Sequence, residues 1–548
     1  MKKTKTALIS VFHKEGIVEF AQQLVSMGWN ILASGGTARH LKENDIPVKD
    51  VAEIVGGKAI LGHRVVTLSR EVHAGILARL DVAADVEELE GLGVPMINLV
   101  CCDFYPLRME IEKSESTRTT IIEMIDIGGP TMVKSAGKAG RIVICDPNDR
   151  EQVIEQLKSA DDLPTETYDY LQGKAFAEVT RYYMDAARYL SNGDYDGMLA
   201  RRVHELAYGE NRDQSPAFIF TTDDGDPLAL SNFKIVNGNP GWVNAADIDT
   251  TVGIMCRMAE TFRQNFGSVP YIAIACKHAV PSGAAFDWND PVIAAQKAMM
   301  GDPVAVMGAE VVVNFPITDE VSKAIHVVPK SLRRRAGRKI WGVDVIAGPE
   351  FSEDAISRLT KRKDRRLLIN PALSDPFMPT NEWMVRPVRG GFMQQRAPRF
   401  IISLDNIQSW TNGAITDRDQ LATMFMIHAL VWGVPSNCVG LANNNMLIGL
   451  GLKQRDRRTC CYLVRNGAKA SGHDTEGAVF ASDAFFYIPK RKNMNQLREG
   501  PELLRDIGCV AGVVPADGKY LDSVVDFFTE SGMNVAFLPK EHRGFSQH

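Results

Sequence analysis

Lys277-His278 directly follows the apolar run Tyr271–Cys276, and these two residue types could do acid–base chemistry. A histidine at the carboxyl end of a strand can act as a base near neutral pH. A neighbouring lysine can stabilise negative charge that develops on a substrate. The pair therefore predicts a catalytic base with a supporting cation, although an ordinary surface Lys-His dipeptide would look the same.

Two glycine pairs could hold an anion or a reacting carbonyl. Ser34-Gly35-Gly36-Thr37 follows the apolar run Trp29–Ala33 and opens a helix, where free N–H groups and the helix dipole favour phosphate. The segment Asp126-Ile127-Gly128-Gly129-Pro130 places a carboxylate before a second helix start, and Lys138 lies further along that helix. A buried Asp126–Lys138 pair could polarise a carbonyl, while a tight turn and a structural ion pair remain the plain alternatives.

Several other chemistries find no support in the sequence. It contains no GxGxxG, Walker A, HExxH or GxSxG motif, which removes the usual signals for dinucleotides, ATP, metalloproteases and serine hydrolases. The nine cysteines include the pairs Cys101-Cys102 and Cys460-Cys461 but no zinc-finger spacing, so we expect reduced thiols and no tightly bound metal.

The elements that would position the first two glycine segments alternate between strand and helix. Helical spacing begins at Ile17, and Pro130–Gly137 reads as a short helix. The predicted strands are Ala7–Phe12, Trp29–Ala33, Ile97–Cys102 and Arg141–Asp146. Strands that alternate with helices predict an α/β domain with a parallel sheet covered on both faces.

A helical stretch over Ala175–Leu190 and a turn-like segment after it place a domain boundary near residue 199. Beyond it we expect a second α/β region in which Ser436–Ala442 and Met446–Leu450 pair as a hairpin through three asparagines. Its other predicted strands are Tyr271–Cys276, Val304–Val306, Cys509–Val514 and Asn534–Leu538. No internal repeat is evident by eye.

The length and charge of the chain limit its number of domains and its possible ligands. The 548 residues suffice for three or four domain-sized units, and 62 basic against 67 acidic residues give a net charge of -5. No global positive charge is therefore available to bind nucleic acid or an acidic membrane. Residues 330–366 are locally basic, and we expect either a solvated helix face or a funnel for an anionic substrate there.

The apolar runs in the sequence are too short to suggest a membrane protein. The longest N-terminal apolar run, Ala7–Phe12, is too short for a signal peptide, and no stretch approaches the 18 apolar residues of a membrane-spanning helix. We expect a soluble, cytoplasmic protein.

Taken in order, these segments resemble the AICAR transformylase/IMP cyclohydrolase family of purine biosynthesis. The N-terminal matches are SVFHKEG (10–16), ASGGTA (33–38), GHRVVTL (62–68), VHAGILAR (72–79), DFYP (103–106) and IDIGGP (125–130). The C-terminal matches are AYGENRDQ (207–214), NGNPGWVN (237–244), CKHAVPSGAA (276–285), VIAGPEF (345–351), PSNCVGLANNNMLIGLG (435–451), ASDAFF (481–486) and, loosely, HRGFSQH (542–548). The resemblance implies a methylglyoxal-synthase-like doubly wound domain over 1–199 and a transformylase of two cytidine-deaminase-like subdomains over 200–548.

The resemblance also implies the activity. A formyl group passes from 10-formyltetrahydrofolate to the 5-amine of AICAR, and the product cyclises to IMP. The implied catalytic residues are Lys277, His278 and Asn437 for transfer and Tyr105, Asp126 and Lys138 for ring closure. The implied substrate-binding residues are Ser10, Lys14, Ser34, Gly35, Gly36, Thr37, Arg64, Thr67, Gly128, Gly129, Tyr208, Asn237, Gly238, Phe485 and Arg543. A homodimer whose transformylase site spans the interface is implied as well.

The sequence departs from the family pattern at several positions. Val66 stands where the family has a lysine, Ala207 where it has an arginine, and Lys490 where it has an aspartate. Three alternatives therefore stay open: a paralogue that formylates a related aminoimidazole or aminopyrazole carboxamide nucleotide, a transformylase without cyclohydrolase activity, and a non-catalytic nucleotide-binding homologue.

Overall fold

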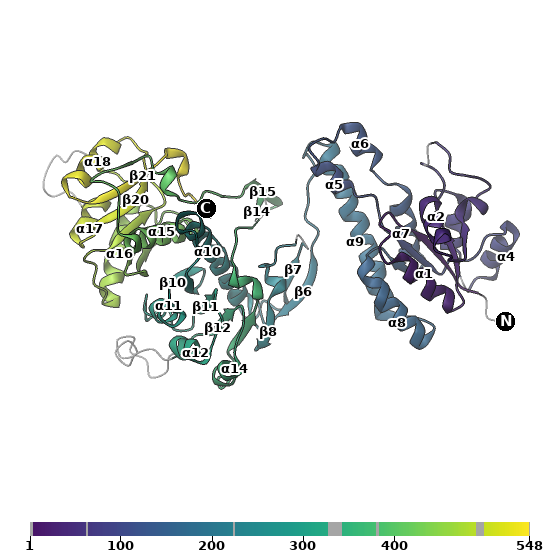
Figure 1. Ribbon diagram of the computed structural model, residues 1–548, viewed down its shortest axis with the longest axis horizontal. Coiled ribbons are helices and arrows are strands. Elements are labelled where there is room, and N and C mark those ends of the chain that lie inside the picture. The colour runs from purple at the N-terminus through teal and green to yellow at the C-terminus, as the bar shows by residue number, and fades with distance from the viewer. Residues whose placement is uncertain are drawn as a thin grey trace. The chain divides into compact units, whose positions relative to one another are not determined.

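The computed structural model describes residues 4–61, 64–79, 81–222, 225–326, 342–379, 383–488 and 498–546. The chain divides into two compact units, Met1–Leu199 and Ala200–His548. The first unit is drawn in purple to blue and the second in teal to yellow (Figure 1). Each unit has its own sheet and its own hydrophobic core.

The N-terminal unit contains a five-stranded sheet in the order β3-β2-β1-β4-β5, with all neighbours parallel. Its strands are β1 (Thr6–Ser10), β2 (Asn30–Ala33), β3 (Val48–Asp50), β4 (Leu99–Cys102) and β5 (Ile142–Ile144). Every residue of β4 and β5 is buried, as expected for a sheet covered on both faces. The predicted parallel α/β domain is confirmed.

Amphipathic helices cover this sheet. They are α1 (Ile17–Ser26), α2 (Gly35–Glu43), α3 (Arg70–Leu77), α4 (Ala83–Leu92), α5 (Leu107–Glu112), α6 (Arg118–Glu123), α7 (Gly128–Lys138), α8 (Arg150–Ala160) and α9 (Thr165–Leu190). Helix α7 packs on β4, β5, α3 and α9, and α1 packs on α8. The strand order reverses at β1, with β2 on one side and β4 on the other, and in such sheets the crevice at this point receives ligands.

The C-terminal unit is built on one twelve-stranded sheet in the order β16-β21-β20-β19-β17-β18-β10-β9-β11-β12-β13-β8. Its strands are β8 (Lys234–Asn237), β9 (Tyr271–Lys277), β10 (Val280–Asp287), β11 (Glu310–Val313), β12 (Val345–Gly348), β13 (Arg366–Ile369), β16 (Ser409–Trp410), β17 (Val439–Asn443), β18 (Met446–Gly451), β19 (Val479–Ser482), β20 (Ala511–Pro515) and β21 (Asn534–Leu538). The predicted hairpin is present as β17 and β18.

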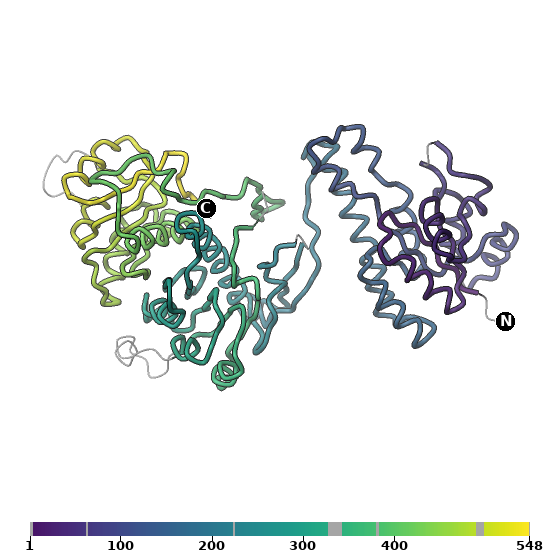
Figure 2. The backbone as a smooth tube through the Cα atoms, viewed as in Figure 1, coloured from purple at the N-terminus to yellow at the C-terminus, as the bar shows by residue number. Residues whose placement is uncertain are grey.

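The sheet consists of two halves with the same order of elements. In each half an antiparallel hairpin, β9–β10 or β17–β18, is followed by three parallel strands and flanked by an antiparallel edge strand. The halves meet through the antiparallel neighbours β10 and β18. Figure 2 colours the first half teal to green and the second green to yellow. A structural repeat is therefore present, although the sequence shows none by eye.

Helices cover both faces of this sheet. They are α10 (Trp242–Phe266), α11 (Pro291–Ala298), α12 (Asp319–His326), α14 (Glu353–Leu359), α15 (Arg418–Trp432), α16 (Arg457–Ser471), α17 (Gly500–Asp506) and α18 (Leu521–Glu530). The long helices α10 and α15 pack against each other over the largest buried apolar cluster. Two small hairpins complete the unit, β6 (Arg201–Leu206) with β7 (Ala217–Thr221) and β14 (Trp383–Val388) with β15 (Gly391–Arg396).

One predicted strand is wrong. Val304–Val306 lies in a turn, and the strand of this region is β11, which starts at Glu310. The reason is local: the Asp302 carboxylate accepts hydrogen bonds from the N–H groups of Val304 (2.9 Å) and Ala305 (3.1 Å). An aspartate that binds backbone N–H groups two and three residues ahead favours a turn over a strand.

Candidate functional site

A cavity of about 730 Å³ lies at the carboxyl ends of β1, β2 and β4 in the N-terminal unit. The predicted residues that line it are Ser10, Lys14, Ser34, Gly36, Thr37, Arg64, Thr67, Tyr105, Asp126, Gly128 and Gly129. These residues come from segments far apart in sequence, and the parallel sheet brings them together because the carboxyl ends of its strands share one edge.

The first turn of α2 is the anion-binding part of this cavity. The N–H groups of Gly35 and Gly36 are the first two of the helix, so they have no intrahelical acceptor. The Ser34 hydroxyl shares a 2.7 Å hydrogen bond with the Ser10 hydroxyl, which joins the ends of β1 and β2. The Thr37 hydroxyl accepts from the Val11 N–H (3.1 Å), so this side chain braces the loop. Lys14 Nζ donates to the Val11 carbonyl and to Thr37 Oγ1 (3.2 Å), so its charge is held beside this turn, and the free backbone N–H groups remain for a phosphate.

Asp126 sits at the start of α7, where it accepts a 3.0 Å hydrogen bond from the Gly129 N–H. A Cβ on Gly129 would lie 2.5 Å from Asp126 Oδ2, and one on Gly128 would lie 2.7 Å from Thr67 Oγ1, so both positions need glycine. Burial raises the pKa of Asp126 above its ordinary value. Burial and Asp126 also raise the pKa of Tyr105. The site thus holds a carboxyl and a phenol that keep their protons more strongly than in water.

Lys138 is not brought to this cavity. It is exposed at the last residue of α7, whereas Asp126 precedes the first. An α-helix rises 1.5 Å per residue, so the eleven residues of α7 separate the two ends by roughly 15 Å. The predicted buried Asp126–Lys138 pair is therefore wrong.

Two further residues of the cavity bear on the departures from the family pattern. Val66 lines the cavity and packs against the hydrophobic core, so its side chain offers no hydrogen bond there. Arg64 pairs with Glu123 through Nε–Oε2 at 3.2 Å, and both side chains are at least half exposed. Exposed ion pairs of this kind contribute little stability, so Arg64 is free to turn toward an anion.

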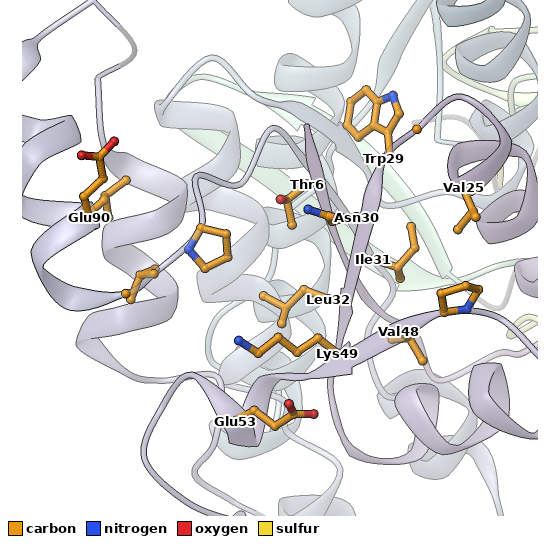
Figure 3. A pocket seen from close by; sticks show the side chains of 16 residues that line it. Thr6, Val25, Trp29, Asn30, Ile31, Leu32, Val48, Lys49, Glu53 and Glu90 are labelled. Atoms are coloured by element: carbon orange, nitrogen blue, oxygen red, sulfur yellow. The ribbon is translucent and has the colours of Figure 1, made fainter. Parts of the chain in front are cut away.

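A larger cavity of about 880 Å³ lies elsewhere in the same unit and holds none of the predicted residues (Figure 3). It opens beside β2, β3 and α4, and its charged side chains are Lys49, Glu53 and Glu90. Among the described residues that line it there is no histidine, cysteine or arginine. Size alone therefore does not mark the reactive site of this unit.

In the C-terminal unit a cavity of about 650 Å³ surrounds the Lys277-His278 pair. Tyr208, another predicted site residue, also lines this cavity. Its lining further includes Asn244, Asp247, Glu310, Asp344 and Arg362. His278 is exposed and Lys277 half-buried, and Lys277 Nζ donates a 2.8 Å hydrogen bond to the Met307 carbonyl. The base and the cation predicted from the sequence therefore face the same hollow.

The turn that carries His278 has an unusual backbone. His278 and Ala279 both have φ 57°, in the left-handed region that is uncommon outside glycine and in which alanine in particular is disfavoured. The Asp247 carboxylate accepts from the N–H groups of His278 (2.8 Å) and Ala279, which holds the turn from the side of α10. The turn is thus fixed by a helix far away in sequence.

Sequence reasoning missed Asp247 and Glu310. Both are buried, at 1% and 2% exposure, and Glu310 accepts a 2.6 Å hydrogen bond from Asn244. Burial and the neighbouring Asp247 raise the pKa of Glu310 to about 9. Only their charge within otherwise apolar stretches, such as Glu310 before three valines, could have drawn attention to them.

The remaining predicted transformylase residues lie outside this cavity. Asn237 Nδ2 donates to the Arg365 carbonyl at the edge of the sheet, and Gly238 follows it. Asn437 Nδ2 donates to the Gln454 carbonyl at 2.8 Å. Phe485 packs on Gly518, and Arg543 pairs with Asp517 at 3.0 Å.

These outlying residues nevertheless share one edge of the sheet with His278. The strand directions place the end of β9, the start of β17 and the ends of β19 and β21 on the same side. Three strand spacings separate β9 from β17, so Asn437 lies roughly 14 Å along this edge from the turn of His278. A single chain therefore does not bring Asn437 into contact with the His278 turn.

Part of the basic segment 330–366 faces the transformylase cavity. Residues 330–341, including Arg333-Arg334-Arg335, lie outside the described residues. Arg362 lines the cavity and pairs with Asp344 at 2.7 Å, while Arg365 is buried and donates to backbone carbonyls. Arg362 also pairs with Asp364 at 3.0 Å, so two carboxylates offset its charge, and both predicted roles of the segment stay predictions.

The described residues offer neither a metal-binding cluster nor a membrane-spanning helix. No group of three or more His, Cys, Asp or Glu side chains there could hold a metal ion. No helix within those ranges is both long and apolar enough to cross a membrane.

The chain is similar to known proteins over most of its length. The AICARFT/IMPCHase bienzyme family matches residues 139–466, and the MGS-like domain matches residues 16–131. The bifunctional purine biosynthesis protein PurH of Caldicellulosiruptor saccharolyticus is 31% identical over 496 residues, which cover 88% of this chain and 90% of that protein. PurH of Anoxybacillus flavithermus is 30% identical over 547 residues, covering 98% and 99%. A solved structure, "Crystal structure of ForH", is 31% identical over 34% of this chain and 99% of its own, with a TM-score of 0.31. From the family match over more than half its length and these relatives, the chain belongs to the AICARFT/IMPCHase bienzyme family.

Proposed function

We propose that this chain formylates AICAR with 10-formyltetrahydrofolate in residues 200–548 and closes the ring of the product to IMP in residues 1–199. Membership of the bienzyme family supports both reactions of this purine-biosynthesis sequence. The observation that carries the assignment is the cavity in which Lys277 and His278 face the same hollow. The folate acts here as a co-substrate.

In the transfer step the amine nitrogen of AICAR forms a bond to the formyl carbon. Its lone pair is conjugated with the carboxamide system, so the amine is a weak nucleophile and needs a base. His278 takes the amine proton, and tetrahydrofolate leaves with a proton restored to its N10. Lys277, held beside the Met307 carbonyl, stabilises the negative charge that develops on the formyl oxygen.

In the ring-closing step the carboxamide nitrogen attacks the formyl carbon and water leaves. Asp126, with its raised pKa, is suited to donate a proton to the departing oxygen, and Tyr105 lines the same cavity. The nucleotide phosphate binds the first turn of α2 with Lys14 and Arg64. Lys138 takes no part because it lies at the far end of α7.

Separate assays of the two reactions test this function. Wild-type protein should catalyse formyl transfer to AICAR and cyclisation of the formylated product. Val66→Lys should change cyclisation alone, because Val66 lines only the N-terminal cavity. Folded wild-type protein that lacks either reaction contradicts the corresponding half of the proposal.

We also propose that the chain acts as a cytoplasmic homodimer in which Asn437 serves the site of the other copy. The support is the separation of roughly 14 Å between Asn437 and the His278 turn along the sheet edge. Sedimentation should show a dimer, and cell fractionation should place the protein in the cytoplasm. Mixing His278→Asn with Asn437→Ala protein should restore roughly a quarter of wild-type transfer, because hybrid dimers contain one intact site. No restoration in exchanging dimers contradicts the shared site.

A further inference from the structure

Two buried acids lie beneath the turn that carries Lys277 and His278. Asp247 comes from α10 and Glu310 is the first residue of β11. Both oxygens of Asp247 are used by the turn, since Oδ2 accepts from the His278 N–H and Oδ1 from the Ala279 N–H. The Asp247 carboxylate therefore ties α10 to the backbone of the turn through both of its oxygens.

Glu310 has the opposite pattern of contacts. Its Oε1 accepts from Asn244 at 2.6 Å, but its Oε2 is buried and has no partner recorded among the described residues. The same side chain lies within hydrogen-bond reach of Asp247. Two buried carboxylates in contact would repel each other if both were charged. A proton on Glu310 Oε2 removes the repulsion and gives this oxygen a partner, because it can then donate to Asp247. The raised pKa of Glu310, about 9, agrees with a neutral side chain near neutral pH.

The second half of the sheet shows that the hairpin forms without these acids. Thr423 is the sixth residue of α15, as Asp247 is the sixth of α10, and its hydroxyl accepts from the Asn445 N–H at 3.2 Å. Val479 begins β19 and pairs with Ala442, two residues before the turn, as Glu310 begins β11 and pairs with Cys276. A hydroxyl and a valine therefore suffice for the same architecture.

We propose that Glu310 is a positioning residue for formyl transfer: its neutral carboxyl donates a hydrogen bond to Asp247, which fixes the left-handed turn and so places Lys277 and His278. This inference rests on the proposed function. Glu310 acts through Asp247 and needs no contact with the reacting atoms. Its hydrogen-bonding proton, and not a negative charge, is what the site requires.

Full-length Glu310→Gln and Glu310→Met separate these requirements. The glutamine amide can accept from Asn244 and donate to Asp247, so kcat for formyl transfer should stay within about threefold of wild type. Methionine has a similar length but no donor, and kcat should fall about 100-fold with little change in KM for AICAR, because a small misplacement of the base is costly. Cyclisation, measured on the same samples, should remain unchanged in both.

A double variant, Asp247→Thr with Glu310→Val, installs the pair that the second half uses at the same positions. This variant keeps the test possible if Glu310→Met does not fold, because threonine and valine occupy the equivalent positions of the second half. It should fold and transfer formyl groups as poorly as Glu310→Met. Crystal structures supply a readout that is independent of the substrate: the turn at His278 and Ala279 should shift in Glu310→Met and stay in place in Glu310→Gln.

Three results overturn the proposal. Equal rates in Glu310→Gln and Glu310→Met show that the donor is dispensable. A raised KM at unchanged kcat assigns Glu310 to substrate binding. A turn that does not move in Glu310→Met removes the positioning role. If wild type itself fails to transfer formyl groups while the turn still shifts in Glu310→Met, the proposed function fails and the structural coupling stands.

Discussion

The two halves of the twelve-stranded sheet build the same hairpin turn from residues with different backbone preferences. The second half uses Asn444 and Asn445, with φ 49° and 62°, and asparagine enters the left-handed region readily. The first half uses His278 and Ala279 in the same conformation, and although histidine enters it more readily than most residues, alanine does so at a cost of about 1–2 kcal/mol. Asp247 accepts two backbone N–H bonds from that turn, whereas Thr423 accepts only the Asn445 N–H and donates to the Asn445 side chain at 2.8 Å. Backbone strain thus lies in the half with the predicted catalytic pair, as is common at functional sites.

The halves also differ in which strand ends they present to the shared edge. Because β10 and β18 run antiparallel, the first half presents the amino ends of β11, β12 and β13, and the second presents the carboxyl ends of β19, β20 and β21. In the first half the reactive residues therefore sit on the hairpin and before the parallel strands. In the second half the candidate residue Phe485 follows a strand, as usual for α/β sheets.

The largest expected effect comes from giving the first turn the residue of the second. In His278→Asn the turn should persist, because asparagine tolerates the left-handed conformation. Formyl transfer should fall about 1,000-fold in kcat through loss of the base, with cyclisation unchanged. Asn444→Gly alters the equivalent turn of the second half and serves as the control, which should retain transfer. A loss below tenfold in His278→Asn would place the base elsewhere.

The reverse exchange should damage the second half. Val479→Glu puts a carboxyl where Glu310 stands in the first half, but the residue at the position of Asp247 is Thr423, which offers no paired acid. A buried carboxyl without a suitable partner should lower the free energy of unfolding by about 3–5 kcal/mol. Tryptophan fluorescence reports this unfolding, because six of the seven tryptophans lie in residues 200–548. Val479→Leu is the matched apolar control, and equal stability of the two variants would contradict the prediction.

A smaller, pH-dependent effect is expected for the stability of Glu310→Gln. The pKa of Glu310 is about 9 in the folded protein against 4.5 for the free side chain, owing to burial and to Asp247, with Asp344 contributing. The contribution of the neutral carboxyl is complete below pH 4.5 and is lost as the pH rises through about 9, because the unfolded chain releases this proton first.

Glutamine does not titrate, so Glu310→Gln should gain stability over wild type progressively across that window. The gain should be on the order of 2 kcal/mol near pH 6, roughly 1.5 pH units above the pKa of the free side chain, and should keep growing toward pH 9, measured as urea midpoints at several pH values. Cys276 pairs with Glu310 across the strands and titrates only at higher pH, since burial raises its pKa as well. A pH-independent difference would show that Glu310 is already ionised.

Much of the architecture followed from the sequence because it depends on local patterns. Buried parallel strands give short apolar runs, so Trp29–Ala33 and Ile97–Cys102 were placed to within a few residues of β2 and β4. The gathering of Ser34 and Asp126 at one cavity follows from the rule that strand carboxyl ends meet at one edge.

The missed features depend on contacts that no local pattern records. Asp247, His278 and Glu310 meet only because α10, β9 and β11 pack together, and periodicity in a single element does not reveal such a set. The apolar run Val304–Val306 forms a turn because the Asp302 carboxylate accepts two backbone hydrogen bonds. Lys138 was misplaced because helix length, and not sequence order, sets its distance from Asp126.

The smallest expected effect tests whether the second turn is structural only. Thr423→Val removes the hydroxyl that accepts from the Asn445 N–H and donates within α15, at nearly constant volume. The free energy of unfolding should fall by about 1–2 kcal/mol, because one accepted and one donated hydrogen bond are lost at roughly 0.5–1 kcal/mol each. Formyl transfer should be unaffected, since this turn lies at the edge of the sheet opposite to His278. A loss of transfer as large as in Glu310→Met would mean that the halves are coupled through β10 and β18, and that the strain of the first turn is not held by Asp247 and Glu310 alone.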